Sequence, residues 1–382
     1  MSGMRRGLER TAAVARKEAL HILRDPRSLI MALALPLLML LLFGYALTLD
    51  VDRIPTLILD RDQTTQSREL IERFAGSRYF TILGEVQNYG EIEQRIDRDQ
   101  CLLAVVVPAD YSRNLLMNKE AEVQLIFDGS DSNTASIALG YADALTQSYA
   151  MELRQQAFNR RAGGRLDPPI ETRLRVWYNS ELKSRNYIVP GLIGVILMII
   201  AALLTSLTIA REWEMGTMEQ LLSTPLRAHE LVLGKMAAYF ALGLADMLIA
   251  MGVGVLVFGV PLRGSPLLVL ATSCVFLVGA LFWGIFLSAV ARAQLLAYQL
   301  GMITSFLPAF LLSGFVFAIE NMPVVVQAVT YIFPSRYFIT GLKGVFLKGV
   351  GLEVLWLEFG LLAVYAAVIF LLATRKLTGK LA

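Results

Sequence analysis

Few residues in this sequence have the types and spacing that chemistry requires. There are two histidines, His21 and His229, and two cysteines, Cys101 and Cys274, and no spacing among them matches a zinc site. The run DGSDSN at 128–133 matches a calcium-binding loop only in part, because its glycine stands second instead of sixth. We interpret it as a turn followed by a helix cap. We therefore expect no metal site, no cofactor bound by this chain and two free thiols.

Nucleotide chemistry is excluded by a missing motif. The phosphate-binding pattern G-x-x-x-x-G-K followed by Ser or Thr occurs nowhere in the 382 residues. The chain therefore cannot hold nucleotide phosphates in a P-loop. Nothing in the sequence indicates an enzyme active site or a nucleic-acid partner.

One segment does combine charged and apolar residues in a pattern suited to a partner protein. The sequence REWEMGTMEQLLSTPL at 211–226 follows a long apolar stretch and contains a proline near its end. Acidic and apolar side chains alternate there at helical spacing, which favours a short helix with one face presented to a partner. The residues that we assign to this contact are Arg211, Glu212, Glu214, Met215, Gly216, Thr217, Glu219, Leu222 and Pro225.

The composition shows what must position that segment. Charged residues make up 18% of the chain and hydrophobic residues 55%, whereas soluble domains carry about 25% charged residues. The charge is uneven, because residues 50–186 hold 38 of the 67 charged residues and the longer segment 187–382 holds only 19. The sequence therefore predicts a polytopic α-helical membrane protein with one inserted block that faces water.

Six segments are long and apolar enough to cross a hydrocarbon core, which takes about 20 residues. The first is 29–49, and the segment 187–382 holds five more. Those five lie at about 187–210, 236–262, 264–291, 293–319 and 352–374. Prolines and glycines interrupt the apolar residues that follow the fifth span, so we predict an outer re-entrant hairpin at 320–351.

The orientation follows from the distribution of Lys and Arg in the short flanking segments. With the N-terminus inside, the cytoplasmic flanks hold 14 of these bases and the short outer segments hold 4. We therefore predict that both termini are cytoplasmic. The first span lacks a cleavage site and is expected to remain as an anchor. Residues 1–28 are predicted to form an amphipathic helix in the headgroup plane; the alternative is a helix docked on protein.

The charged block 50–186 alternates strand and helix patterns. Short apolar runs predict strands at 56–59, 80–83, 102–107 and 123–127. Helical patterns separate them and continue after the last one, at 65–74, 89–98, 111–117 and 132–159. We expect a loop at 160–169 and a returning strand at 172–178. The block is thus predicted to be an α/β domain outside the cytoplasm.

Asp246 is a single charge within the third apolar segment. An ionised carboxylate at the centre of a span costs about 2.5–3.5 kcal/mol on insertion scales, so this side chain should face protein or water. Three roles remain open. Asp246 could be protonated and hydrogen-bonded to Ser or Thr of a neighbouring span, could pair with a base of another chain, or could line a path for cationic cargo.

Several ordered motifs resemble one family, and together they cover nearly the whole chain. REWEMGTMEQLLSTP after the second span resembles the coupling-helix signature of ABC-2 (type-2) ABC transporter permeases. The segments RKE at 16–18, RDPR at 24–27, DGS at 128–130 and SGF at 313–315 are also similar to that family. So are Met322-Pro323 and the residues Tyr331, Pro334, Arg336, Tyr337 and Phe338. Within it, the chain resembles the subfamily with a large periplasmic insertion between spans one and two.

The resemblance implies a multidrug-efflux-type permease of a bacterial inner membrane. Such permeases are dimers, homo- or heterodimeric, and cytosolic ATPase subunits that hold ATP and Mg²⁺ energise them. The resemblance implies that the segment 211–226 is the coupling helix, with Met215, Met218 and Leu222 filling a groove of the ATPase. It also implies a dimer seam on the second and fifth spans. A periplasmic membrane-fusion adaptor and an outer-membrane channel are further expected partners.

Two other classes remain as alternatives. One is a membrane-anchored periplasmic sensor or scaffold, although an anchor needs only one or two spans. The other is an ion-coupled secondary transporter that uses Asp246. The sequence favours export of amphipathic small molecules over both, and it does not select a particular cargo.

Overall fold

The computed structural model describes residues 2–47, 51–117, 119–162, 177–179 and 183–378. The chain forms two compact units. The first unit comprises Met1–Thr48 and Val176–Ala382, and the second comprises Leu49–Arg175. Each unit is treated by itself below.

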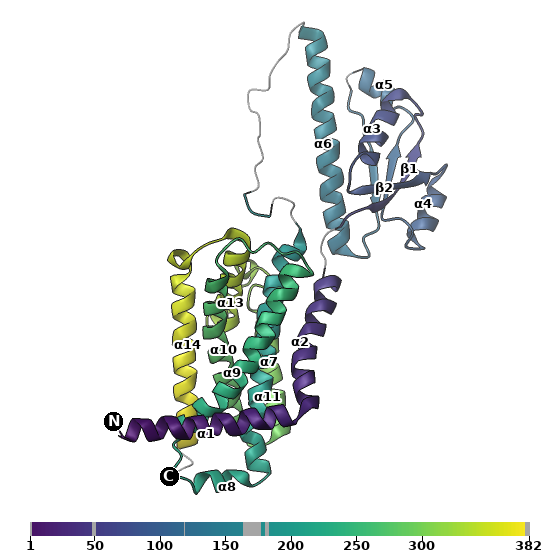
Figure 1. Cartoon of the computed structure of the whole chain (residues 1–382). Coiled ribbons are helices and arrows are strands. Elements are labelled where there is room, and N and C mark those ends of the chain that lie inside the picture. Colours follow the sequence, from purple (N-terminus) through teal and green to yellow (C-terminus); the bar gives the residue numbers. More distant parts are fainter. Residues whose placement is uncertain (1, 48–50, 118, 163–176, 180–182, 379–382) are drawn as a thin grey trace. The chain divides into compact units, whose positions relative to one another are not determined.

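The first unit is a bundle of helices (Figure 1). Its long helices are α1 (Ser2–Arg24), α2 (Pro26–Ala46), α7 (Ser184–Glu214), α9 (Ala228–Leu256), α10 (Pro266–Ala291), α11 (Gln294–Leu311) and α14 (Leu352–Thr378). Its short helices are α8 (Thr217–Leu222), α12 (Val324–Thr330) and α13 (Pro334–Lys343), followed by a π turn at Gly344–Lys348. Among the described residues, α7, α9, α10, α11 and α14 are long and apolar enough to cross a membrane. Helix α2 contributes a shorter apolar stretch, Ala32–Ala46.

Helix α7 is the centre of this bundle. It packs against α10, α11, α9, α2 and α13. Within its most apolar 18-residue stretch, 83% is buried inside the chain. Leu197 and Ala202 are 1% and 0% exposed. The chain's own helices therefore cover Leu197 and Ala202 in the expected seam on the second span, whereas Leu203 and Leu204 stay partly exposed, so that seam remains a prediction. Helix α11 is only 22% buried and keeps an open face.

Small residues bring α10 unusually close to α7. A Cβ atom on Gly284 would lie 2.5 Å from the carbonyl oxygen of Ala202, so only glycine fits at this crossing. Thr205 Oγ1 donates to the carbonyl of Leu281 over 2.9 Å. Ser288 Oγ accepts from two backbone amides near the end of α7. Interhelical contacts of this kind hold membrane helices together where the hydrophobic effect is absent.

Short helical segments separated by turns connect α11 to α14, in the region where the sequence predicts a re-entrant hairpin. Helix α11 ends at Leu311, eight residues before the expected boundary, because Pro308 weakens its last turn and Gly314 has a left-handed φ of 79°. Helices α12 and α13 follow, separated by a turn that precedes Pro334.

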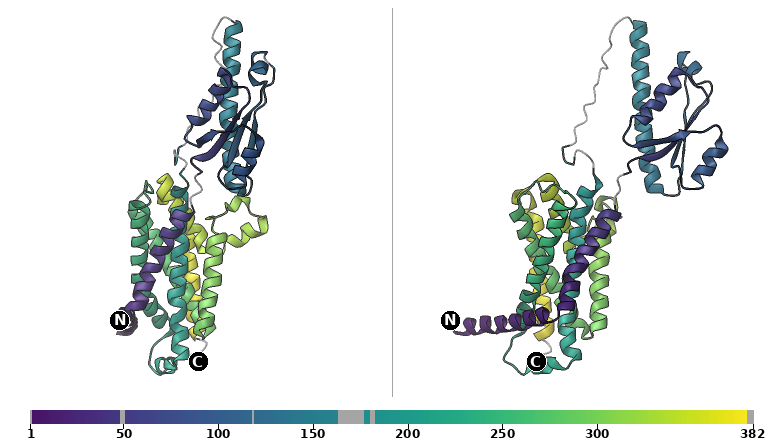
Figure 2. Two further views of the ribbon diagram at one scale, coloured as in Figure 1. Left: turned by 90° about the vertical axis from the view of Figure 1, so that its right-hand side faces the viewer. Right: turned by 45° about the vertical axis from the view of Figure 1, so that its right-hand side comes forward.

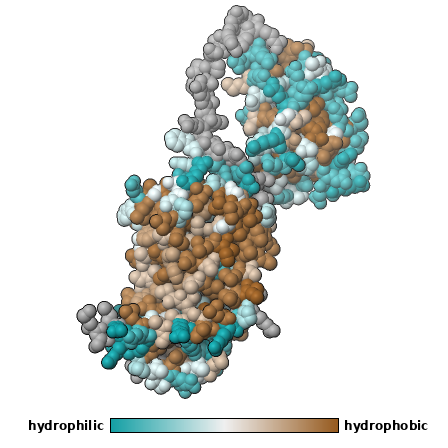
Figure 3. Space-filling view, viewed as in Figure 1, coloured by the Kyte–Doolittle hydropathy of each residue, from teal (hydrophilic) through white to brown (hydrophobic). Residues whose placement is uncertain are grey.

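Helix α1 runs across the bundle at the end where α8 lies (Figures 1 and 2). It packs along α9, while Leu8 and Leu23 remain 67% and 66% exposed. The surface in Figure 3 is hydrophobic over the long helices, and hydrophilic residues gather at the level of α1. Helix α1 is thus docked on protein along one face, and another face with apolar residues stays open.

The second unit is an α/β domain with a four-stranded sheet. The strands are β1 (Ile54–Asp60), β2 (Phe80–Glu85), β3 (Leu103–Val107) and β4 (Gln124–Phe127), in the order β2-β1-β3-β4. Strands β1, β2 and β3 are parallel, and β4 pairs with β3 in the antiparallel sense. The helices are α3 (Thr65–Ala75), α4 (Tyr89–Ile96), α5 (Tyr111–Leu116) and α6 (Ser132–Ala162).

The helices cover the two faces of the sheet unequally. Leu70 and Phe74 of α3 and Ala138 and Ala142 of α6 share one core with Ile58 of β1. Alternate strand residues point the other way. Leu57, Leu59, Ala104 and Val106 pack instead with Ile92 of α4. The crossovers therefore follow opposite faces, as in doubly wound sheets.

The four strands and the first three helices lie within a few residues of their predicted positions. The last helix, α6, runs three residues further than expected, so that 160–162 are helical. The remainder of the expected loop at 160–169 and most of the expected strand at 172–178 lie outside the described residues. Trp177 and Tyr178, which are described, are not in a strand.

Candidate functional site

The segment 211–226 folds as a sharp turn between two helices. Helix α7 continues through Glu214, Met215 caps it, and Gly216 takes a left-handed φ of 67°. A residue with a Cβ atom is strained in that conformation, so the glycine allows α8 to begin at once with Thr217. The predicted helix is therefore short and spans only Thr217–Leu222.

Glu212 is engaged inside the chain. Its Oε1 lies 2.8 Å from Lys17 Nζ of α1 and 3.5 Å from Lys235 Nζ of α9. Its Oε2 accepts a hydrogen bond from Thr217, the first residue of α8. The Glu212 side chain is only 12% exposed. One carboxylate thus joins α7, α8, α1 and α9.

Lys235 and Glu18 form the buried core of this cluster. Lys235 Nζ lies 2.6 Å from Glu18 Oε1, and the side chains are 2% and 6% exposed. Removing one partner of such a pair leaves an uncompensated charge in a poorly solvated place, which costs about 3–5 kcal/mol. We call Lys17, Glu18, Glu212 and Lys235 the inner ion cluster.

A second contact fixes α1 on α9. Arg10 lies 2.6 Å from Glu230 Oε1, and Glu230 Oε2 accepts from the backbone amide of Arg227. A Cβ atom on Gly234 would lie 2.6 Å from Val14, so the two helices nearly touch there. Arg10, Val14 and Glu18, on three consecutive turns of α1, therefore all contact α9.

Glu214 connects the same turn to α11. Its two oxygens accept from the backbone amide of Gln294 over 2.7 Å and from Gln294 Nε2 over 2.5 Å. An acceptor at this position satisfies a free amide of the first turn of α11 and suits the positive end of its dipole. Arg292 lies over the Trp213 ring at 5.1 Å. The end of α7 therefore holds the turn between α10 and α11.

The other residues of the segment 211–226 lie on two faces of the turn, one buried and one exposed. Met218 is 2% exposed and packs with Leu231 of α9 and Leu377 of α14. Arg211 lies 3.2 Å from His21 Nε2 of α1. Met215 is 68% exposed, and Glu219 and Pro225 are also exposed. The side chain of Leu222 is outside the described residues.

Sequence reasoning located the segment but missed its partners. Glu18, Lys235 and Gln294 come from parts of the chain 23–217 residues away from the residues that they bind. Lys235 was the one sequence signal for these contacts, because this base lies only seven residues after the start of the apolar helix α9. A base at that position needs an acidic partner.

Asp246 lies deep in α9 and is 2% exposed. Neither of its carboxylate oxygens has a hydrogen-bond partner among the described residues. On the buried side of α9, Gly243 faces Leu277 of α10 and Gly254 faces Ile193 of α7. The expected hydrogen bond to a neighbouring Ser or Thr is therefore not formed in this part of the chain.

Other chemistry is not built into the described residues. They include no group of three or more His, Cys, Asp or Glu side chains that could hold a metal ion. Cys101 is buried, its thiol donates to the carbonyl of Leu103, and burial raises the pKa of that thiol. A protonated, buried thiol is unreactive.

The fold and the site define a class. Apolar helices surround a central helix, and the polar side chains that are best ordered link helix ends instead of forming a catalytic cleft. This is the arrangement of a multi-pass membrane protein.

Comparison with known proteins identifies the family. Residues 26–375 match the profile of the ABC-2 family transporter proteins. The chain is 38% identical over 341 residues to the probable multidrug ABC transporter permease YbhS of Escherichia coli, covering 89% of each chain. It is 34% identical to YbhR, of the same description, over 89% of this chain and 90% of the relative. It is 26% identical to the inner membrane transport permease YhhJ of Escherichia coli, over 86% of this chain and 87% of the relative.

The chain therefore belongs to the ABC-2 family, and it is a permease subunit of an ABC exporter. The resemblance noted in the sequence is confirmed. Permeases of this family are multi-pass inner-membrane proteins, and in general they act as dimers with an ABC ATPase partner.

The inner ion cluster generates a stability prediction. Lys235→Met removes the close cation of the buried Glu18 and leaves it only Lys17 at 4.0 Å, whereas Glu212 keeps Lys17 at 2.8 Å. We expect the free energy of unfolding to fall by about 3–5 kcal/mol, measured as a lower thermal midpoint of the purified permease in detergent. Adding Glu18→Gln to Lys235→Met should restore much of the loss.

The control is Arg5→Met, whose pair with Glu9 is exposed and contributes less than about 1 kcal/mol. Equal midpoints for Lys235→Met and Arg5→Met would contradict the assignment.

Proposed function

We propose that this permease exports amphipathic, drug-like molecules from the cytoplasm or the inner leaflet, driven by ATP and Mg²⁺ bound to a partner ATPase. The observation that carries the proposal is the α7–α8 turn, which exposes Met215 and Glu219 on one side and is tied to four other helices on the other. The descriptions of YbhS and YbhR as probable multidrug permeases support the cargo class. The apolar spans suit cargo of that kind.

The proposed topology has six crossings with both termini in the cytoplasm. Helix α2 supplies the first crossing, and the five longer helices supply the others. The excess of Lys and Arg beside α1, α8 and the end of α14 supports this orientation. The α/β unit Leu49–Arg175 then lies in the periplasm between the first two crossings.

The proposed ATPase contact is the exposed side of the turn. Met215, Glu219, Gln220 and Pro225 are exposed there and can enter a groove of a partner. Glu212, Glu214 and Met218, which the sequence also assigned to the partner, already have contacts within the chain. We propose that these three transmit the movement instead of receiving it.

Transmission follows from the hydrogen bonds and ion pairs of the turn. A displacement of α8 acts on Thr217 and hence on Glu212, which holds α1 and α9. The same displacement acts on Glu214, which holds the first turn of α11. Closure of two ATPases would therefore tilt α7, α9 and α11 as connected bodies and open a path alternately to the two sides.

The proposed assembly is a homo- or heterodimer. The open face of α11 carries Tyr298, Met302 and Leu307, which are 44%, 37% and 53% exposed. It is the better seam, since α7 is enclosed by its own chain. A periplasmic membrane-fusion adaptor that leads to an outer-membrane channel would meet the α/β unit, which is the water-facing part of the chain.

Glu219 gives a test of the ATPase contact. Its side chain is exposed and has no hydrogen bond or ion pair among the described residues, so Glu219→Lys should leave the fold intact. We expect Glu219→Lys to abolish stimulation of ATP hydrolysis by transport cargo, because it reverses the charge presented to the ATPase. Copurification and ATPase assays of the reconstituted complex measure this.

The matched control is Glu353→Lys, an exposed acid in the first turn of α14 at the other end of that helix from Leu377. It should keep stimulation at the level of the unmodified chain. Full stimulation in Glu219→Lys would contradict the proposed contact. Glu212→Lys is a poor test, because it disturbs the inner ion cluster.

Asp246 favours a second, narrower proposal about cargo. The Asp246 carboxylate has no hydrogen-bond partner among the described residues, and an unpaired carboxylate is expensive in hydrocarbon. Two of the roles considered from the sequence remain, namely pairing with a base of another chain and attraction of cationic cargo. We propose the second, in which Asp246 meets the cation when the bundle opens around it.

Asp246→Asn tests this role, since it keeps the shape of the side chain and removes its charge. We expect export of a cationic dye to fall about tenfold and export of a neutral dye of similar size to stay unchanged. Transport into inverted vesicles measures both. If export of both dyes is unchanged, or if both are lost together, Asp246 does not select cationic cargo.

A further inference from the structure

The α/β unit has a crevice where doubly wound sheets place their ligands. Strand β1 lies between β2 and β3, and the chain leaves β1 toward one side and β3 toward the other. The connecting helices α3 and α4 cover opposite faces of the sheet. The carboxyl ends of the parallel strands lie at one edge of the sheet, which is where ligands of open α/β sheets bind.

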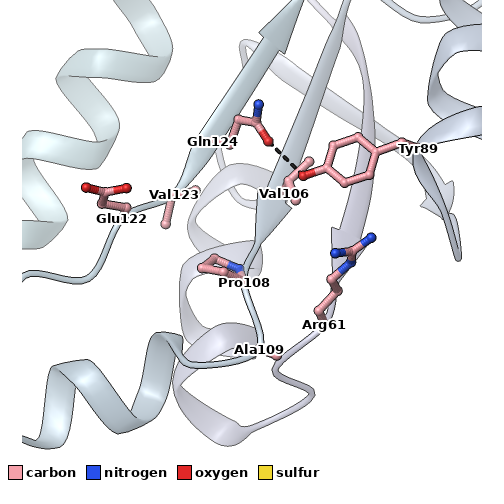
Figure 4. A pocket seen from close by; sticks show the side chains of 8 residues that line it. All are labelled: Arg61, Tyr89, Val106, Pro108, Ala109, Glu122, Val123 and Gln124. Atoms are coloured by element: carbon pink, nitrogen blue, oxygen red, sulfur yellow. Dashed lines mark hydrogen bonds between the residues drawn. The ribbon is translucent and has the colours of Figure 1, made fainter.

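A hollow of about 510 Å³ occupies this place (Figure 4). Arg61 follows β1, Pro108 and Ala109 follow β3, and Tyr89 is the first residue of α4. Its remaining lining residues are Val106, Glu122, Val123 and Gln124. The volume lies within the range of about 300–1,000 Å³ that is usual for small-molecule sites.

The loops around the hollow are firmly held. The backbone amide of Arg61 donates to the carbonyl of Val107 over 3.0 Å, which joins the ends of β1 and β3. Asp60 accepts from two backbone amides and from Ser67. Asp62 accepts from Thr64 and from both the amide and the hydroxyl of Ser112. The two carboxylates beside Arg61 are therefore already satisfied.

The charges on the lining side chains have no such partners. Arg61 lies over the ring of Tyr89 at 5.0 Å and forms no ion pair with any described residue. Tyr89 donates to Gln124 Oε1 over 2.8 Å, which closes one wall. Glu122 also forms no ion pair in the described part of the unit. Figure 4 shows Glu122 and Arg61 on opposite sides of Pro108. Among the described residues, the guanidinium of Arg61 and the carboxylate of Glu122 thus have no ion-pair partner, and they flank a floor made by Pro108 and Val123.

We propose that this hollow binds a small amphipathic zwitterion. Arg61 holds its carboxylate, because a guanidinium presents paired donors that match carboxylate geometry. Glu122 holds its ammonium group at the other side. The apolar body of the ligand lies over Pro108 and Val123. The site belongs to the α/β unit alone, so its ligand binds without ATP or an ATPase, and the inference does not rest on the proposed function.

Three fluorescent probes that differ by single charged groups test the site on the full-length permease in nanodiscs. Nα-dansyl-lysine carries a carboxylate and an ammonium group, dansyl-norleucine carries only the carboxylate, and dansylcadaverine carries only the ammonium group. Fluorescence anisotropy without nucleotide measures their dissociation constants. We expect Nα-dansyl-lysine to bind about tenfold more tightly than either single-charge probe.

Two variants then test the charges of Arg61 and Glu122 one at a time. Arg61→Ala should weaken Nα-dansyl-lysine and dansyl-norleucine about tenfold and leave dansylcadaverine unchanged. Glu122→Gln should weaken Nα-dansyl-lysine and dansylcadaverine and leave dansyl-norleucine unchanged. Both side chains are exposed, so neither change should disturb the fold, and circular dichroism checks this.

The control is Arg98→Ala, an exposed arginine that follows the far end of α4 and does not line the hollow. It should bind all three probes as the unmodified chain does. Equal affinities of the three probes, or the same affinities in Arg61→Ala and Arg98→Ala, would show that binding occurs at the bilayer or elsewhere in the chain and would overturn the proposal.

Discussion

The buried ammonium group of Lys235 is the constraint on which the end of the helix bundle beside α8 depends. An unpaired charge at that depth would cost several kcal/mol, so the side chain must meet carboxylates. Glu18 of α1 and Glu212 of α7 supply them at 2.6 and 3.5 Å. Helices α1, α7 and α9 therefore cannot separate at this end without exposing a charge to an unfavourable environment. The site that meets the ATPase in our account lies one turn beyond.

This constraint gives the short helix α8 its influence. Six residues contain too few hydrogen bonds to transmit force by themselves, and α8 is bound instead to the helices around it. Thr217 and Glu212 attach it to the inner ion cluster, Glu214 attaches the same turn to α11, and Met218 seats it on α9 and α14. Because α7 packs against α10, α11, α9, α2 and α13, a movement that enters here reaches most of the bundle.

The sequence predicted the elements well and their contacts poorly. Apolar length located the five long apolar helices, and short apolar runs located all four strands, because both signals are local. The partners of Glu212 and Glu214 were missed, since Lys17 and Gln294 are 195 and 80 residues away from them. The burial of α7 within its own chain was missed for a similar reason: hydropathy does not distinguish a helix that faces lipid from one that faces other helices. The end of α11 was predicted too late in the chain. It depends on the left-handed conformation of Gly314, which composition alone does not reveal.

Because Glu212 binds both Lys17 of α1 and Thr217 of α8, these two helices should move as one body when the ATPase closes. Double electron–electron resonance between spin labels at Ala12→Cys on α1 and Ser223→Cys after α8 tests it most directly; both positions are exposed. Cys101 and Cys274 are first replaced by serine, and labelled chains are diluted so that each complex carries one pair. The account predicts the same distance distribution without nucleotide and with ATP trapped in the ATPase. A shift of that distribution, or a second distance on nucleotide binding, would contradict it.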